Sequence, residues 1–250
     1  MMFKKCAKQF NYFYHDNESY KQYNQVSGSD ALIKGQLFHN GADDFFDVIK
    51  KQENWTLEFF KSAVKSKHEE VQKWLEWFAE QEWNRWIQCR VESLDPKAEF
   101  MPMAKELQIT MPDVIDRTGH VDRIDKVIGK KELQIVEYKT GKSYNMDKTW
   151  AATSMNAEIG FYVQILNSIN QFPGYKIKEW KVINPTLETT WVNKISPISL
   201  KAVETTFNTI VESINNKGPF ERTVSPLCRY CPYVEDCLFS DEIDILGEFE

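Results

Sequence analysis

Apolar residues in the first third of the chain recur at the spacing of an α-helix. Residues 35–90 follow a largely helical pattern, and from Val71 onward Trp74, Leu75 and Phe78 recur at helical intervals. Five tryptophans lie in this stretch. Aromatic residues at helical spacing form a core more often than a base-stacking platform, so we expect these to be buried. The pattern predicts a helical subregion at about residues 35–95.

The hydrophobic pattern changes after residue 104. Alternating positions predict three consecutive strands, in "ELQIT", "TGHVDRIDKVI" and "ELQIVEYK". Residues 157–170 follow a helical pattern, 175–184 predict a further strand, and 199–216 predict an amphipathic helix capped by Ser199. This order of elements predicts a layered α/β or α+β domain.

Composition and charge set broad limits on what the chain can be. Its 250 residues, 42% of them hydrophobic, suffice for one large domain with a core. No apolar run approaches the roughly 18 residues of a membrane span, and the N-terminus has no signal-peptide pattern, so we expect a cytoplasmic protein. The net charge of −6 gives no indication of nucleic-acid binding. A local exception is the basic stretch "KTGKSYNMDK" at 139–148.

The turn at Gly129-Lys130 fixes a register for the strands on either side. A two-residue turn with glycine first fits a type II′ hairpin. That register puts Asp122 directly opposite Glu137, with Cβ atoms roughly 5 Å apart. Lys139 projects from the same face because side chains alternate along a strand. The hairpin therefore predicts two facing carboxylates beside a lysine.

Two facing carboxylates repel each other, and something must offset that cost. A divalent cation does so better than a lysine, and hard oxygen ligands suit Mg²⁺ or Mn²⁺. Asp125 points to the opposite face, which makes it a less suitable ligand. An alternative fits the spacing equally well: a surface ladder of charges in which Lys139 simply neutralises Glu137.

Asp122 of "GHVDRID" is followed after 14 intervening residues by "EYK", and this combination resembles the signature of the PD-(D/E)XK nuclease superfamily in its RecB-like form. The resemblance implies a restriction-endonuclease-like α/β core with a central mixed β-sheet flanked by helices, at about residues 104–215. The helical subregion would be an insertion, and residues 1–250 would form a single nuclease domain. The implied activity is metal-dependent hydrolysis of DNA phosphodiester bonds.

The same resemblance assigns roles to residues of the candidate site. Asp122, Glu137 and the Tyr138 carbonyl would hold the metal, and Lys139 would orient or deprotonate the attacking water. His39, in "GQLFH", matches a histidine of the family's N-terminal helix and would be a further ligand. Taken alone, His39 fits a surface or core histidine better.

One further match departs from the family pattern. RecB-like members often have glutamine followed by tyrosine four residues later on the helix after the lysine strand. Here "EIGFY" supplies Glu158 and Tyr162. Glutamate in place of glutamine leaves the role of Glu158 open, and Tyr162 would contact the DNA backbone.

Cysteines at both ends of the chain predict a second metal site. Three of them form "CRYCPYVEDC", and one lies in "FKKCAKQFNYFY". Clustered cysteines without a secretion signal favour metal ligation over disulfides. Both motifs are similar to those of iron–sulfur RecB-like nucleases, which implies a structural 4Fe–4S cluster that clamps residues 1–12 to 225–240. A zinc site is the alternative. The four candidate ligands are Cys6, Cys228, Cys231 and Cys237.

The resemblance also bears on the substrate. Iron–sulfur relatives include AddB-type nuclease domains and CRISPR-associated exonucleases, which implies an exonuclease acting on single-stranded or end-bearing DNA. A helicase, recombination or CRISPR adaptation partner would then be expected, and a virus-encoded version fits equally well. Two alternatives stay open: a non-catalytic DNA-binding or scaffold subunit, and a nuclease directed at RNA.

Overall fold

The chain divides into two compact units, residues 28–203, and residues 1–27 together with 204–250. The β-sheet lies in the first unit. No described helix is both long and apolar enough to cross a membrane. The computed structural model describes residues 6–7, 30–112, 117–216, 218, 220–224, 228, 231, 233 and 237.

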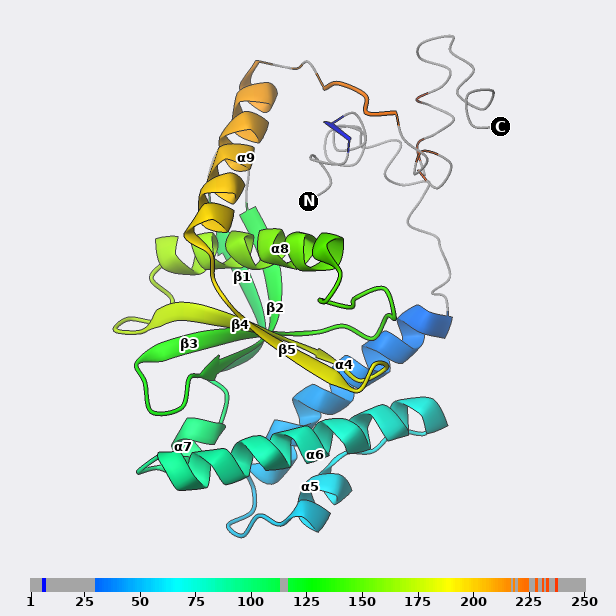
Figure 1. Cartoon of the computed structure of the whole chain (residues 1–250), viewed down its shortest axis with the longest axis vertical. Coiled ribbons are helices and arrows are strands. Elements are labelled where there is room, and N and C mark those ends of the chain that lie inside the picture. Colours follow the sequence, from blue (N-terminus) through cyan, green and yellow to red (C-terminus); the bar gives the residue numbers. More distant parts are fainter. Residues whose placement is uncertain are drawn as a thin grey trace. The chain divides into compact units, whose positions relative to one another are not determined.

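A five-stranded mixed sheet forms the centre of the larger unit (Figure 1). Its strands are β1 (Ala104–Met111), β2 (Arg117–Lys126), β3 (Glu132–Tyr138), β4 (Lys176–Asn184) and β5 (Thr189–Lys194). They lie in sequence order, and every neighbouring pair is antiparallel except β3 and β4. A parallel pair needs a long crossover, which a helix supplies between these two strands. The predicted α/β fold with a mixed sheet is confirmed, and β5 is a strand that the sequence pattern did not reveal.

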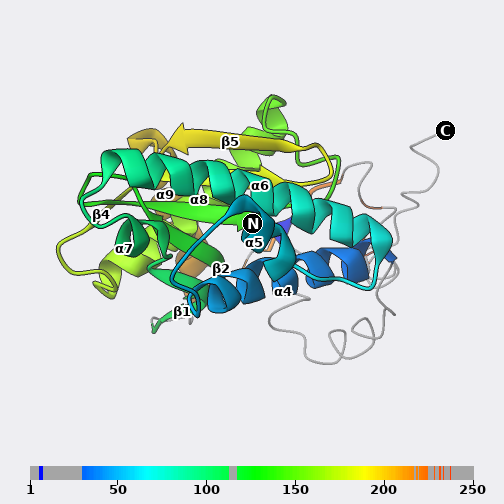
Figure 2. The same cartoon turned by 90° about the horizontal axis from the view of Figure 1, so that it is seen from below.

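Helices cover both faces of this sheet. The helices of the described residues are α4 (Asp30–Ile49), α5 (Leu57–Ala63), α6 (Glu69–Glu92), α7 (Pro96–Phe100), α8 (Thr149–Ser168) and α9 (Pro197–Asn215). Figure 1 shows α4, α6 and α7 on one face of the sheet and α8 on the other. In Figure 2, seen from the α6 side, α6 lies across the sheet with α4 beside it. The residues predicted to be helical form four separate helices, α4 to α7.

Aromatic side chains fill the core between α4, α6 and the sheet. Phe38, Phe45 and Phe46 recur at helical spacing along α4, and all three are fully buried. Phe78 of α6 meets each of their rings edge to face, and also packs on Tyr138 of β3. The tryptophans of this region are buried or packed against the same core. The expectation that these aromatic residues form a core, not a stacking surface, is confirmed.

Two helices begin earlier than the sequence pattern indicated. The helix expected from residue 157 begins at Thr149, and the one expected to be capped by Ser199 begins at Pro197. The backbone N–H of Ser199 donates to Oγ of Ser196 at 3.4 Å. Ser196 therefore precedes the helix as its cap, and the prediction for Ser199 was wrong by one turn.

The hairpin between β2 and β3 keeps the predicted register with a different turn. Arg123 pairs with Val136, which is the alignment that the sequence predicted. The turn's hydrogen bond runs from Lys130 N to Val127 O, so Gly129, with φ of 71°, is the third residue of the turn. This corrects the predicted type II′ turn, in which glycine comes second.

Candidate active site

Asp122 and Glu137 come together at the end of the β2–β3 hairpin. Continuing the observed register places them opposite each other, as predicted. Both are buried, at 7% and 2% exposure. Oδ2 of Asp122 accepts a hydrogen bond from the backbone N–H of Tyr138 at 2.7 Å. A carboxylate that is only 2% exposed is not part of a surface ladder, so that alternative does not fit Glu137.

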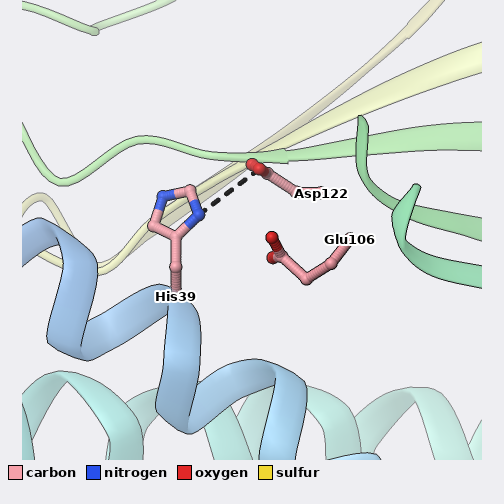
Figure 3. A group of neighbouring side chains, drawn as sticks. All are labelled: His39, Glu106 and Asp122. Atoms are coloured by element: carbon pink, nitrogen blue, oxygen red, sulfur yellow. Dashed lines mark ion pairs between the residues drawn. The ribbon is translucent and has the colours of Figure 1, made fainter. Parts of the chain in front are cut away.

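His39 reaches this pair from helix α4. Its Nδ1 lies 3.3 Å from Oδ1 of Asp122 (Figure 3). The imidazole stands edge-on to the ring of Tyr138, and neighbouring Phe38 anchors the helix in the core. Burial alone would lower the pKa of His39, but the Asp122 carboxylate outweighs it and raises that pKa. Burial acts in the opposite sense on Asp122, and the hydrogen bond with His39 holds its pKa below the usual value. The structure thus joins the predicted histidine to the predicted aspartate.

Glu106 of β1 completes the group, and sequence reasoning missed it. One ligand atom from each of His39, Glu106 and Asp122 lies within 4.8 Å of the others (Figure 3). Leu107 pairs with Val121, so the same register sets Glu106 opposite Asp122. The signal was present, because Glu106 begins the predicted strand "ELQIT". No turn motif revealed how that strand pairs with the next one.

The backbone of Glu106 is unusual. Its φ is 45°, in the left-handed region that a strand residue with a side chain seldom adopts. Such a conformation costs on the order of 1–3 kcal/mol and is found most often at functional sites. Burial and the Asp122 charge raise the pKa of Glu106, whose side chain is 35% exposed.

Lys139 lies between two carboxylates. Its Nζ is 2.9 Å from Oε2 of Glu137 and 3.2 Å from Oε1 of Glu158. Burial alone would lower the pKa of Lys139, but these two neighbours raise it above its usual value. Burial and Asp122 raise the pKa of Glu137 well above normal, with Lys139 opposing them. The predicted carboxylate–lysine pair exists, and Glu158 is a second partner of the lysine.

Tyr162 lies beside Glu158, and Gly119 leaves room for its ring. Its hydroxyl donates to Oε1 of Glu158 at 3.2 Å. A Cβ atom on Gly119 would lie 2.9 Å from the ring of Tyr162. The glycine of "GHVDRID" therefore leaves the space that this ring occupies. The structure brings Tyr162 to the candidate site, and its contact with DNA stays a prediction.

The donor set fits a divalent cation. Oε1 of Glu106 and Oε1 of Glu137 are buried, and neither accepts a hydrogen bond. Buried carboxylate oxygens without a partner are costly, and a bound cation would satisfy them. Carboxylates with one imidazole suit Mg²⁺ or Mn²⁺. The assignment of the Tyr138 carbonyl as a further ligand stays a prediction.

The second aspartate of "GHVDRID", Asp125, lies on the opposite face of the sheet. Asp125 and Arg123 are almost fully buried there, with Arg123 Nη2 2.9 Å from Oδ2 of Asp125 and 2.9 Å from Oε1 of Glu82. Glu82 also meets Arg85 at 2.8 Å. The prediction that Asp125 points away from the candidate site agrees with this geometry.

The terminal cysteines do not form a ligand group in the part of the chain that the structure describes. Only His39, Glu106 and Asp122 meet as a group there. Burial raises the pKa of Cys231, and the thiols of Cys6, Cys228 and Cys237 add to this shift. Most of the predicted clamp segments, 1–12 and 225–240, lie outside the described residues.

Comparisons with known proteins address the family directly. A search of the curated proteins gave no match. Among solved structures, the chain resembles one from Eubacterium rectale named "Putative exonuclease", with 12% identity over 90% of this chain and 86% of that chain. The TM-score is 0.44, so this likeness carries no argument. The sequence model of the PD-(D/E)XK nuclease superfamily matches residues 2–238, and these include both halves of the facing-carboxylate hairpin. On that match the chain belongs to the PD-(D/E)XK nuclease superfamily.

Proposed function

We propose that this protein is a divalent-metal-dependent deoxyribonuclease, and that it acts as an exonuclease on single-stranded or end-bearing DNA. The observation that carries the proposal is the meeting of His39, Glu106 and Asp122 beside Glu137 and Lys139, in a chain of this family. Preference for ends and for single strands rests on the resemblance to RecB-like members.

The residues of the site divide into two roles. His39, Glu106, Asp122 and Glu137 would hold one or two Mg²⁺ or Mn²⁺ ions. When bound, such an ion polarises the scissile phosphate and lowers the pKa of a coordinated water. Lys139, whose raised pKa keeps it protonated at neutral pH, would orient that water and stabilise negative charge on the phosphate.

We propose a structural 4Fe–4S cluster at the two ends of the chain. The support is the cysteine spacing in the sequence and the raised pKa of Cys231, to which the other three thiols contribute. Anaerobically purified protein should then contain about four iron and four sulfide ions and absorb near 400 nm. Stoichiometric zinc in place of iron would mean that the cysteines bind zinc, and this result would overturn the proposed iron–sulfur cluster.

We propose association with a helicase, recombination or CRISPR adaptation partner, which follows only from the resemblance, and the cytoplasmic location stays an expectation from the sequence. Affinity capture of the full chain from its own host, followed by mass spectrometry, tests this. Recovery with a helicase subunit would support a place in end processing.

The decisive experiment is cleavage of end-labelled DNA by the full chain with and without Mn²⁺. Linear single strands, linear duplexes, circular single strands and RNA are compared under the same conditions. Release of nucleotides from linear DNA, with circles left intact, is expected. Glu137→Gln should remove activity. Binding of DNA with no cleavage in any metal would leave a non-catalytic binding subunit, and cleavage that survives Glu137→Gln would sink the assignment.

A further inference from the structure

We propose that Tyr144 and Trp150 form a base-stacking platform that holds single-stranded DNA beside the candidate active site. The platform lies on the β3–α8 loop (residues 139–148) and the first turn of α8. This inference rests on the proposed function and extends it, because it names side chains that would grip the bases instead of the phosphates.

These two residues are large aromatic side chains with unusual exposure. Trp150 is 57% exposed and Tyr144 is 42% exposed. Ala151 and Met155, which follow Trp150 on α8, are buried against the sheet. Trp150 therefore points away from the core that the rest of the helix packs on. Tryptophan and tyrosine rings left in solvent are suited to stacking on a ligand ring.

Tyr144 is linked to the candidate site by geometry. Its ring centre lies 5.8 Å from Nζ of Lys139, the lysine that meets Glu137 and Glu158. A Cβ atom on Gly141 would lie 3.1 Å from the Tyr144 ring. The ring thus packs closely over the backbone of the loop at Gly141.

The loop that presents Tyr144 is fastened to the sheet. Nδ2 of the fully buried Asn184 donates to the carbonyls of Gly141 and Tyr144, at 3.0 and 3.3 Å. The hydroxyl of Thr186 donates to the carbonyl of Thr140. A loop held at three carbonyls keeps its aromatic ring in place before the substrate arrives, which lowers the entropy lost on binding.

The charge of the loop matches a nucleic-acid strand. Lys142 and Lys148 are exposed and lie on either side of Tyr144 in sequence. Asp147, the acidic residue between them, accepts a hydrogen bond from Nε1 of Trp191 at 3.1 Å. Basic residues interleaved with aromatic rings are how sequence-tolerant proteins hold single strands, with cations on the backbone and rings on the bases. In a chain of net charge −6 this concentration of lysines is local.

The test separates stacking from other causes of weak binding. The full chain, in EDTA so that no cleavage occurs, is titrated into fluorescent dT oligonucleotides and into abasic oligonucleotides of the same length. Trp150→Ala and Tyr144→Ala should each weaken dT binding by roughly five- to a hundredfold. The same changes should weaken abasic binding much less, and Trp150→Phe and Tyr144→Phe should retain most of the dT affinity. Leu94→Ala, fully exposed on another surface, is the matched control.

Each outcome decides a different question. Equal losses on the dT and abasic strands would overturn the platform, because the rings would then act on the backbone or on the fold of the loop. Unchanged dT affinity in both alanine variants would overturn it as well. Failure of the unaltered chain to bind either oligonucleotide would overturn the platform as well, because base stacking needs no metal; the cleavage assay with Mn²⁺ tests the proposed function separately. Thermal unfolding of each variant checks that the fold is intact.

Discussion

The carboxylates of the candidate site hold their protons with unequal strength. Asp122 has a pKa below the usual value because His39 donates to it, whereas burial raises the pKa values of Glu137 and Glu106. The pKa of His39 is raised as well. In the metal-free protein, His39, Glu106 and Glu137 therefore keep their protons to a higher pH than usual. A cation that binds to these side chains has to displace those protons.

Mn²⁺ binding should therefore strengthen as the pH rises. A group with a raised pKa is protonated below that pKa, so acidification adds competing protons, and each displaced proton costs up to about tenfold in affinity per pH unit. Calorimetric titration from pH 6 to 8, in buffers of different ionisation enthalpy, should record proton release on binding. Glu137→Gln should reduce the proton count. Affinity that is constant over this range would contradict the assigned ligands.

Removing the charge of Glu106 should weaken the metal site. Glu106→Gln keeps the shape of the side chain and removes one anionic donor, so we expect Mn²⁺ affinity to fall by at least about tenfold. Asp44→Asn is the matched control, because Asp44 is an exposed carboxylate on α4, the helix that carries His39. Equal affinities for the two variants would exclude Glu106 as a ligand.

At the scale of elements, a buried ion-pair network fastens helix α6 to strand β2. Arg123 is 1% exposed and pairs with Glu82 of α6 and with Asp125 of its own strand. Burial alone would raise the pKa of Glu82, but Arg123 and Arg85 lower it to about 2. Because these charges are buried away from water, the loss of one of them leaves its partner with an uncompensated charge and destabilises the fold.

Glu82→Gln should destabilise the fold by about 3–5 kcal/mol, because it leaves Arg123 buried with one anion fewer. Glu82 has a depressed pKa, so its stabilising effect is present above its unfolded pKa of about 4.5 and is lost as the pH falls toward 2. Urea unfolding between pH 7 and pH 3 measures both effects. Glu80→Gln, at a more exposed position on the same helix, should leave the midpoint unchanged. A similar shift in both variants would contradict the network.

Gly119 and Tyr162 should behave as a coupled pair. Gly119→Ala introduces a Cβ atom 2.9 Å from the Tyr162 ring and should cost about 1–3 kcal/mol. Tyr162→Leu removes the ring, so the same alanine should cost much less in that background. Urea unfolding of the four proteins gives the coupling energy. Additive costs would mean that glycine is needed for another reason.

The strand pairing within one hairpin was predictable from sequence, and the pairing of β1 with β2, which no turn motif in the sequence marks, was not. The β2–β3 register followed from alternation and a short turn, so Asp122 and Glu137 could be predicted to face each other. Glu106 could not, because nothing in residues 112–116 fixes how β1 pairs with β2. His39 depended on a family motif, since helix α4 meets the sheet only through tertiary packing. Strand β5 was missed because half of it is exposed and lacks a buried face.

For the whole molecule, charge distribution matters more than net charge. A chain of net charge −6 repels DNA at long range, so binding depends on lysines close to the site. With Lys139, Lys142 and Lys148 as phosphate contacts, the slope of log K against log salt should be about −2 for single strands.

Fluorescence titrations of an oligonucleotide from 50 to 300 mM salt measure this slope. Lys142→Gln should reduce its magnitude by about 0.7, and Lys65→Gln, an exposed lysine between α5 and α6, should leave it unchanged. A steep slope that Lys142→Gln does not alter would place the phosphate contacts elsewhere on the chain.

The left-handed backbone of Glu106 also bears on how this chain would evolve. Glycine or asparagine adopts that conformation at lower cost, and either would remove the carboxylate. Laboratory selection for heat resistance alone would therefore favour replacement at position 106, while selection for cleavage would oppose it. At position 106, a substitution that stabilises the fold would therefore reduce the catalytic activity.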